Sequence, residues 1–370
     1  MLNDAVDLST LHRALVIKLR HHGDVLLTSP VFQVLKNHAP HLDIDALVYR
    51  DTREMLTAHP AIAEVHTIDR EWKNLNPFAQ GAAEWKLLRA LLARRYDLVV
   101  HLTNHPRGAW LTRWIGPKVS VAQRAQGINE GRDSRLWKKS FTHTYPTPLT
   151  THRHTVESNL DALRRIGIYP SAEEKKLVLV PGAEAEQKVD QLLALHNVTP
   201  KRFIHMHPTS RWMFKTWPSE KFAQLIHELG RNGERVVLTA APDARERAMI
   251  AAIKTTLKAP VVDLTGSLSL KELAALTARA RAFVGVDSAP MHMAAAMGTP
   301  IVALFGPSSE VLWGPWAKTY RIVSSQDPRH TCRPCGNDGC GGSKVSECLV
   351  ELPVSQVFDA LNEVLAQAGA

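Results

Sequence analysis

Residues 282–304 read AFVGVDSAPMHMAAAMGTPIVAL, and this stretch decides the fold. An apolar run over 282–286 ends at the polar pair Asp287-Ser288, and a second apolar run over 300–304 follows a glycine-containing turn. The segment between them, 291–297, is rich in alanine and methionine, which favour helix. Strands that alternate with helices predict a parallel sheet covered on both faces.

The same alternation extends along the chain in two halves. In the first half we expect strands at 14–19, 44–49, 65–68, 98–102 and 119–121 and helices at 31–38, 82–94 and 154–166. In the second half we expect strands at 203–206, 235–238, 261–264, 282–286, 300–304 and 320–323 and helices at 219–232, 244–257, 270–279 and 291–297. Ser29 is expected to be the N-cap of the first helix, with Pro30 at its first helical position.

The chain is long enough for two domains, because 370 residues exceed the size at which a single core stops growing. We predict two Rossmann-like, doubly wound α/β domains, 1–175 and 176–352, with a hinge in the segment 167–181. Ligands of such sheets bind beyond the carboxyl ends of the strands, so the chemistry is expected in a central cleft that both domains face. The last segment, 353–370, contains an amphipathic helix that either covers a sheet or crosses back onto the first domain.

Composition limits the class of partner. The net charge of +9 fits an anionic partner: a nucleic acid, an anionic membrane surface or a phosphorylated substrate. The same charge also fits a plain solvated surface rich in Lys and Arg. The first residues carry acids where a signal peptide needs bases, and no apolar run reaches the length of a membrane span, so a cytoplasmic location is expected.

The loop after the first expected strand reads KLRHHGD over 18–24. It has one glycine, so neither the dinucleotide fingerprint nor the P-loop is present. Asp24 follows the end of the strand, where a carboxylate can take a proton from an attacking hydroxyl. The alternative is a loop salt bridge with Arg20 or Lys18.

Basic residues surround this loop and suit an acidic or phosphorylated acceptor. Within the loop, Arg20, His21 and His22 stand beside the candidate base. Later strand ends of the same half contribute further candidates, each of which is equally open to being a solvated surface residue: Arg50, Arg53 and Arg107.

The second half contains a candidate diphosphate site. Hydroxyls at Thr209 and Ser210 follow a strand, and Lys215 adds a point charge for phosphate oxygens, unless it is a solvated loop lysine. The helix after 282–286 offers the backbone amides of Ser288, Ala289 and Met291, and the positive end of a helix attracts a pyrophosphate. His292 either faces the phosphates or packs as a structural residue.

Two further groups raise the question of metal. The four cysteines, Cys332, Cys335, Cys340 and Cys348, lie in one short stretch and lack the paired CxxC pattern of a zinc ribbon, so we expect a reduced structural loop. The pair Asp43-Ile-Asp45 has the spacing of a DxD metal motif, but it begins a strand, so a solvated turn is expected. No metal site is predicted.

At residues 18–30, 207–218 and 285–308 the sequence resembles the ADP-heptose:lipopolysaccharide heptosyltransferases of glycosyltransferase family nine, and within them the heptosyltransferase III branch. The resemblance implies a GT-B fold and a metal-independent, inverting displacement without a cofactor. It assigns the general base to Asp24 and donor phosphate contacts to Lys215, and it matches Thr209 and Ser210 to the diphosphate-binding pair. The family's phosphate-binding element corresponds to Asp287, Ser288 and His292, with Ala289 in place of the commoner glycine, and the ribose-binding acid corresponds loosely to Asp243.

The implied partners are an ADP-heptose donor, a phosphorylated inner-core lipopolysaccharide acceptor and the anionic inner face of the inner membrane. The branch implies transfer of the third, branching heptose. Three alternatives stay open: a GT-B enzyme with another nucleotide-sugar donor, a heptosyltransferase I or II acting on an earlier acceptor, and a basic nucleic-acid-binding protein. The last lacks a helix-turn-helix, an RNP-like aromatic pair and a sustained basic stripe, so no nucleic acid is expected.

Overall fold

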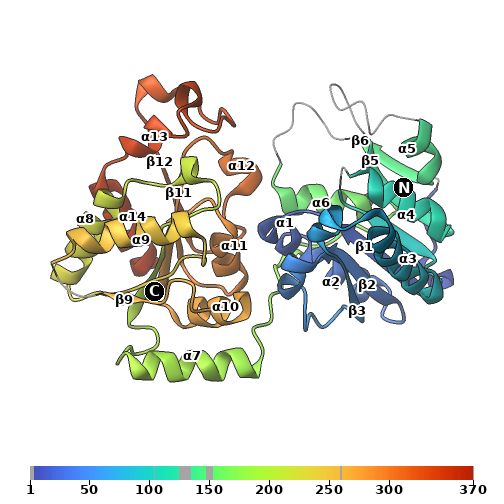
Figure 1. Ribbon diagram of the computed structural model, residues 1–370, viewed down its shortest axis with the longest axis horizontal. Coiled ribbons are helices and arrows are strands. Elements are labelled where there is room, and N and C mark those ends of the chain that lie inside the picture. Colours follow the sequence, from blue (N-terminus) through green and yellow to red (C-terminus); the bar gives the residue numbers. More distant parts are fainter. Residues whose placement is uncertain (1–3, 104, 125–134, 147–152, 259–260, 370) are drawn as a thin grey trace. The chain divides into compact units, whose positions relative to one another are not determined.

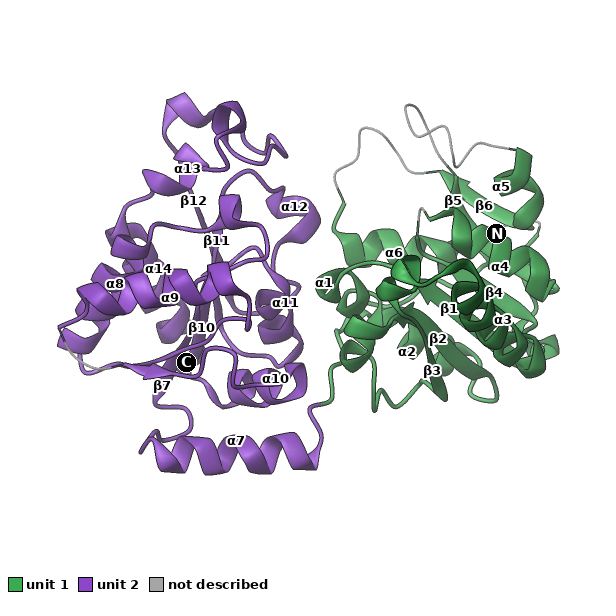
Figure 2. Cartoon of the chain, viewed as in Figure 1, with its two compact units in different colours: residues 1–180 green, residues 181–370 purple. Residues whose placement is uncertain are grey.

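The computed structural model describes residues 4–103, 105–124, 135–146, 153–258 and 261–369. The chain divides into two compact units, residues 1–180 and 181–370 (Figure 2). The division falls a few residues after the expected boundary at 175/176, within the segment 167–181 that the sequence identifies as a hinge.

Unit 1 contains a parallel sheet of six strands in the order β3-β2-β1-β4-β5-β6 (Figure 1). Its strands are β1 (Arg13–Lys18), β2 (Asp43–Tyr49), β3 (Glu64–Ile68), β4 (Leu98–His101), β5 (Val119–Arg124) and β6 (His143–Pro146). Its helices are η1 (Leu8–Thr10), α1 (His22–Leu26), α2 (Ser29–His38), η2 (Arg50–Met55), η3 (Arg70–Asn74), α3 (Pro77–Arg94), α4 (Pro106–Ile115), α5 (Arg135–Ser140), α6 (Thr155–Arg165) and η5 (Glu173–Lys175). One hydrophobic cluster packs α3 onto strands β1, β2 and β4 through Leu15, Leu47, Leu91 and Val99.

Unit 2 repeats this topology with the order β12-β11-β10-β7-β8-β9. Its strands are β7 (Phe203–His207), β8 (Arg235–Leu238), β9 (Val262–Asp263), β10 (Ala282–Val286), β11 (Ile301–Phe305) and β12 (Tyr320–Ser324). Its helices are α7 (Ala183–Leu195), η6 (Met213–Lys215), α8 (Ser219–Arg231), α9 (Ala244–Thr256), α10 (Leu270–Arg279), α11 (Ala289–Ala296), α12 (Glu310–Trp313), η7 (Pro328–His330), η8 (Cys340–Gly342), α13 (Glu347–Val350) and α14 (Val354–Gly369). None of the described helices is long and apolar enough to cross a membrane.

In each sheet the strand order reverses beside the first strand of the unit, between β1 and β4 and between β7 and β10. Every described strand pair is parallel, so all carboxyl ends of one sheet meet at one edge. The crevice at such a reversal is where open α/β sheets bind ligands. The expected α/β class with two doubly wound halves is confirmed.

Each strand and helix that the sequence predicts is present, but several elements were not predicted. Helix α4 contains Gly108, and a Cβ at that position would lie 1.9 Å from Nε2 of His101, so only glycine lets this helix approach β4. Helix α7 buries Ala185, Val189 and Leu193 at a four-residue spacing, a helical signal that the analysis of the sequence passed over.

One local expectation needs correction, and one open alternative is decided. The N-cap of α2 is Thr28, and Ser29 is already helical; its hydroxyl instead accepts a hydrogen bond of 2.9 Å from the amide of Val178. The last helix, α14, packs in the core of unit 2 through Val357, Leu361 and Val364. It therefore covers a sheet of its own unit, which is the simpler of the two roles considered.

Candidate functional site

Asp24 lies at the carboxyl-end edge of the unit 1 sheet, in the first turn of α1 directly after β1. Its side chain is 13% exposed and lies 3.6 Å from Nε of Arg20. The first turn of a helix stabilises a carboxylate through the partial positive charge of the helix end. The loop contact with Arg20 is thus present, and it leaves the carboxylate partly open to solvent.

Lys18 is a buried cation beneath this loop. Its Nζ donates a hydrogen bond of 3.1 Å to Asn159, whose amide in turn donates to the carbonyl oxygen of Leu27. Burial lowers the pKa of Lys18 to about 8; Asp24 opposes this change and Arg20 adds to it. The sequence offers Lys18 as a possible ion-pair partner of Asp24, but its burial beneath the loop is a result of the tertiary structure.

Arg70 joins the surrounding loops, and the sequence analysis missed it. Its guanidinium donates to the carbonyl oxygen of Arg20 at 2.9 Å and to the carboxylate of Asp51 at 3.2 Å, and it lies over the ring of Tyr49. The ring of His22 contacts the carbonyl oxygen of Asp51 at 3.0 Å. Arg70 follows the carboxyl end of β3 almost directly, a position that could have identified it.

The other basic candidates of unit 1 differ in their surroundings. His21 is the N-cap residue of α1. Arg50 is largely exposed and pairs with Asp69 at 3.1 Å, and Arg53 lies exposed on η2. Arg107 is the second residue of α4 and pairs with Glu84 of α3 at 2.9 Å. The structure thus places Arg20 and His22 beside Asp24 and ties Arg107 to a neighbouring helix instead.

In unit 2 the structure joins Lys215 and Asp287, which the sequence separates widely. Asp287 follows β10 and is buried, and its Oδ2 accepts a hydrogen bond of 2.6 Å from Nζ of Lys215 on η6. Lys215 keeps part of its side chain exposed. A lysine fixed by a buried carboxylate is a preorganised charge, so it is no solvated loop lysine.

The N-terminus of α11 lies directly after Asp287. Ser288 is its N-cap residue and Ala289 its first residue, positions whose amides have no partner within a helix. The amide of Met291 donates to the carbonyl oxygen of Ser288 at 3.2 Å, so the expectation that it is an anion donor needs correction. Met291 and His292 are both buried.

Thr209 belongs to a buried polar chain under this edge. Its hydroxyl donates to Glu246 at 2.6 Å and lies 3.3 Å from Nε2 of His207. The hydroxyl of Thr239 links His207 to His205, at 2.8 and 2.7 Å. Burial lowers the pKa of His207 to about 3, so this chain is uncharged at both histidines at neutral pH.

Two acidic residues of the segment that begins α9 differ in their surroundings. Asp243 caps α9 and pairs with Arg245, and its side chain is exposed. Glu246, one turn further along α9, is buried and accepts bonds from Thr209 and from the amide of Ala241. Ser210 is also buried, and its hydroxyl accepts from the amide of Trp212 at 3.3 Å. No pattern in the sequence predicts that Glu246 is buried.

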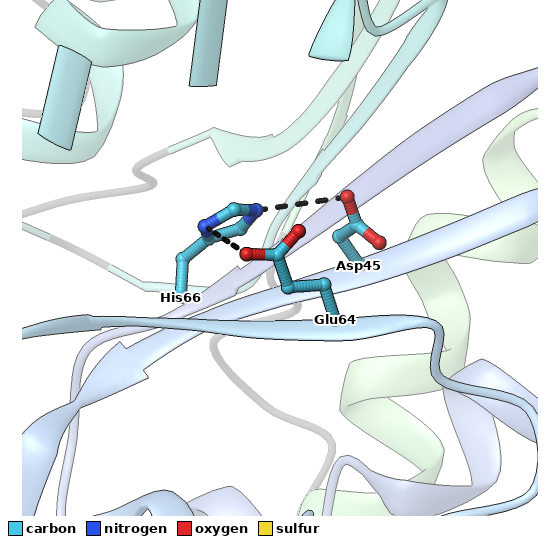
Figure 3. Close-up of side chains that lie close together, drawn as sticks. All are labelled: Asp45, Glu64 and His66. Atoms are coloured by element: carbon cyan, nitrogen blue, oxygen red, sulfur yellow. Dashed lines mark ion pairs between the residues drawn. The ribbon is translucent and has the colours of Figure 1, made fainter. Parts of the chain in front are cut away.

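One group of described residues has metal-like spacing: Asp45, Glu64 and His66 (Figure 3). Each nitrogen of the His66 ring faces one carboxylate: Nε2 lies 3.6 Å from Asp45 and Nδ1 lies 3.5 Å from Glu64. Both oxygens of Asp45 already accept bonds from Arg94, at 2.7 and 3.0 Å. The group therefore fits a structural ion-pair network. Asp45 is fully buried within β2, so the expected solvated turn is wrong.

The cysteine loop contains four thiols, and Cys348 is the buried one. Arg333 holds the loop to the rest of unit 2 by donating to the carbonyl oxygens of Gly306 at 3.0 Å and Ser325 at 2.8 Å. A pocket of about 400 Å³ lies beside it and is lined by Arg333, Glu310 and His330 among others. None of the residues expected to bind the donor lines that pocket.

Comparison with known proteins decides the family. The model of glycosyltransferase family 9 (heptosyltransferase) matches residues 84–340, which is more than half of the chain. The chain belongs to glycosyltransferase family 9. This family 9 chain is 34% identical over 322 residues to lipopolysaccharide heptosyltransferase 3 of Escherichia coli, and the match covers 84% of the chain and 91% of that relative.

Solved structures share the fold of this family 9 chain at lower identity. A glycosyltransferase of family 9 from Veillonella parvula has a TM-score of 0.82 and 23% identity, over 99% of this chain and 100% of that one. Escherichia coli heptosyltransferase WaaC with ADP-2-deoxy-2-fluoro heptose has a TM-score of 0.70 and 19% identity, over 95% of this chain and 99% of that one. The expected GT-B fold and the resemblance to the heptosyltransferases are confirmed.

Proposed function

We propose that this family 9 chain transfers L-glycero-D-manno-heptose from ADP-heptose to a heptose of the lipopolysaccharide inner core. The observation that carries the proposal is the 34% identity to a lipopolysaccharide heptosyltransferase 3 over 91% of that relative. The residues at both sheet edges supply the chemistry that such a transfer requires. By analogy with that relative, we assign to this chain the addition of the third, branching heptose.

The donor side of the proposal rests on charge at the edge of the unit 2 sheet. The leaving group is ADP, whose diphosphate carries the negative charge that develops as the glycosidic bond breaks. Lys215, held by Asp287 at 2.6 Å, and the first amides of α11 are donors that need no reorganisation to meet this charge. We assign Thr209, Ser210 and His292 to the surroundings of the diphosphate and Asp243 to the ribose.

The acceptor side rests on Asp24. Its carboxylate takes the proton of the acceptor hydroxyl, whose oxygen then forms a bond to the anomeric carbon. The bond between that carbon and the ADP oxygen breaks with inversion, and both of its electrons leave with ADP. A positioned general base contributes about 10²- to 10⁴-fold to a rate. Buried Lys18 and neighbouring Arg20 place positive charge beside this carboxylate.

Recognition of the acceptor is assigned to the basic residues of unit 1: Arg20, His21, His22, Arg50, Arg53 and Arg107. A phosphorylated inner core is anionic, and the exposed residues among these attract it before any sugar contact forms. Because the acceptor is a membrane lipid, we place the enzyme in the cytoplasm, peripherally at the inner face of the inner membrane.

The experiment is a transfer assay with purified protein, ADP-heptose and core acceptors bearing no, one or two heptoses. The expected result is transfer to the acceptor that already bears two heptoses. Transfer only to an acceptor with fewer heptoses would assign the chain to an earlier step. Binding of nucleotides is measured by thermal shift, because a ligand at a hundredfold excess over its dissociation constant adds about 2.7 kcal/mol to the free energy of unfolding. Binding of UDP or GDP in preference to ADP would show that the donor is another nucleotide sugar.

A further inference from the structure

Helix α3 exposes an apolar stripe on the surface of unit 1. Phe78, Trp85 and Leu92 follow one another at a spacing of seven residues and are 93%, 59% and 40% exposed. Such a spacing puts the three side chains along one line of a helix. The opposite face of α3 is already buried through Leu87 and Leu91, so burial in the core does not explain the stripe.

Helix α4 continues the apolar surface. Trp110 and Trp114, one turn apart, are 45% and 57% exposed, with ring centroids 6.1 Å apart. Helices α3 and α4 contact each other, and the ion pair between Arg107 and Glu84 joins them at 2.9 Å (Figure 1). We refer to Phe78, Trp85, Leu92, Trp110 and Trp114 as the α3–α4 patch.

The exposed charges on α3 and α4 themselves are of one sign. The exposed charged residues of these two helices are Lys86, Arg89 and Arg113. The acid of the two helices, Glu84, is half-buried and is already paired with Arg107. Exposed tryptophans beside lysines and arginines are typical of a helix surface that lies in the headgroup region of an anionic bilayer.

Charge also decides between a lipid surface and a second copy of the chain. In a symmetric dimer the same patch meets itself, so Lys86, Arg89 and Arg113 would face their own copies. An interface core is normally depleted of lysine, whereas an anionic headgroup layer attracts it. We propose that the α3–α4 patch docks the protein on anionic phospholipid, with the tryptophans in the interface and the three bases on the headgroups.

The place of the patch in unit 1 fits the proposed function, on which this inference rests. Both helices begin at the carboxyl-end edge of the sheet, because α3 follows β3 through η3 and α4 follows β4. Phe78 lies in the first turn of α3 and Trp110 follows the first turn of α4, so both lie toward the sheet edge that also holds Asp24. Docking through this surface would bring the acceptor-binding unit to the lipid that carries its acceptor.

The test is flotation of the full chain with vesicles of phosphatidylcholine, with and without phosphatidylglycerol. We expect binding to the anionic vesicles alone, with a blue shift of tryptophan fluorescence. Combining Trp85→Ser with Trp114→Ser, or Lys86→Glu with Arg89→Glu, is expected to lower the bound fraction at least about tenfold. All four side chains are exposed, so both variants are expected to fold, which circular dichroism checks.

Matched controls come from unit 2, where Leu195→Ser and Arg231→Glu change equally exposed residues. These controls are expected to bind vesicles like the wild type. No binding of the wild type to anionic vesicles, or equal binding of the patch variants, overturns the inference. A dimer in solution that the aromatic variant converts to a monomer also overturns it, in favour of a second copy.

Activity on a delipidated, water-soluble acceptor separates this inference from the proposed function. The patch variants are expected to keep that activity while they lose vesicle binding, because the patch contains none of the residues assigned to the reaction. Wild-type protein that binds anionic vesicles but transfers no heptose would contradict the proposed function while it supports the docking surface. Loss of soluble activity in the patch variants, with their fold intact, would count against a docking role.

Discussion

Replacing Asp45 by asparagine tests whether the buried network of unit 1 holds its sheet together. Asp45 accepts two bonds from Arg94 and one of 2.7 Å from the hydroxyl of Tyr96. Burial opposes ionisation of its carboxyl, and bonds from His66, Arg94 and Tyr96 outweigh that effect. The pKa of Asp45 therefore falls from 3.8 to about 2.

The size of the effect follows from this shift. One pKa unit is worth about 1.4 kcal/mol, so the ionised carboxylate adds roughly 2 kcal/mol to the free energy of unfolding. Because the pKa is lower in the folded state, this contribution is complete above the unfolded value of 3.8 and is lost as the pH falls through about 2. At pH 3 about half of it is expected to remain.

The assay is urea denaturation of wild type and Asp45→Asn at pH 7 and pH 3. We expect the variant to lose about 2 kcal/mol or more at pH 7, and the difference from wild type to shrink to about half at pH 3. Asp43→Asn is the matched control, since Asp43 lies exposed on the same strand and 3.6 Å from Arg13, and such surface pairs are worth little. Equal losses of stability in both variants would refute the reasoning. So would a difference in the free energy of unfolding between wild type and Asp45→Asn that is the same at pH 7 and pH 3.

Three further predictions concern the chemistry. Asp24→Asn is expected to lower turnover by about two to four orders of magnitude with little change in donor affinity, and wild-type turnover in this variant would make the carboxylate structural. Lys215→Ala and His292→Ala are each expected to weaken ADP binding. Loss of the charged contact in Lys215→Ala is expected to raise the dissociation constant about tenfold. Unchanged ADP affinity in both variants, measured by calorimetry, would show that neither residue belongs to the site. Among the thiols, exposed Cys332 is expected to react first with a disulfide reagent. Cys348 is expected to react only on unfolding, because it is buried and burial raises the pKa of its thiol. Release of one zinc ion per chain on unfolding would contradict the prediction of four free thiols.

Sequence patterns located the strands because short apolar runs between helical segments are typical of buried strands in a parallel sheet. They failed where a residue acts through a neighbour distant in the chain. Glycine has a low helix propensity, so Gly108 argues against a helix when the sequence alone is considered. In the structure, the space that its missing side chain leaves is occupied by His101. Asp45 has the spacing of a surface motif, and only its neighbours Arg94 and Tyr96 explain its burial.

The sequence by itself determined the α/β class, the two halves, the family and the candidate residues Asp24, Lys215 and Asp287. These depend on local order along the chain, on strand ends and on helix starts, which short patterns record. Only the tertiary structure decided which groups meet: Lys215 with Asp287, Thr209 with buried Glu246, and Lys18 beneath Asp24. The physical reason is that these contacts form between strand ends that the parallel sheet brings to one edge, and the burial that shifts a pKa is a property of the packed unit.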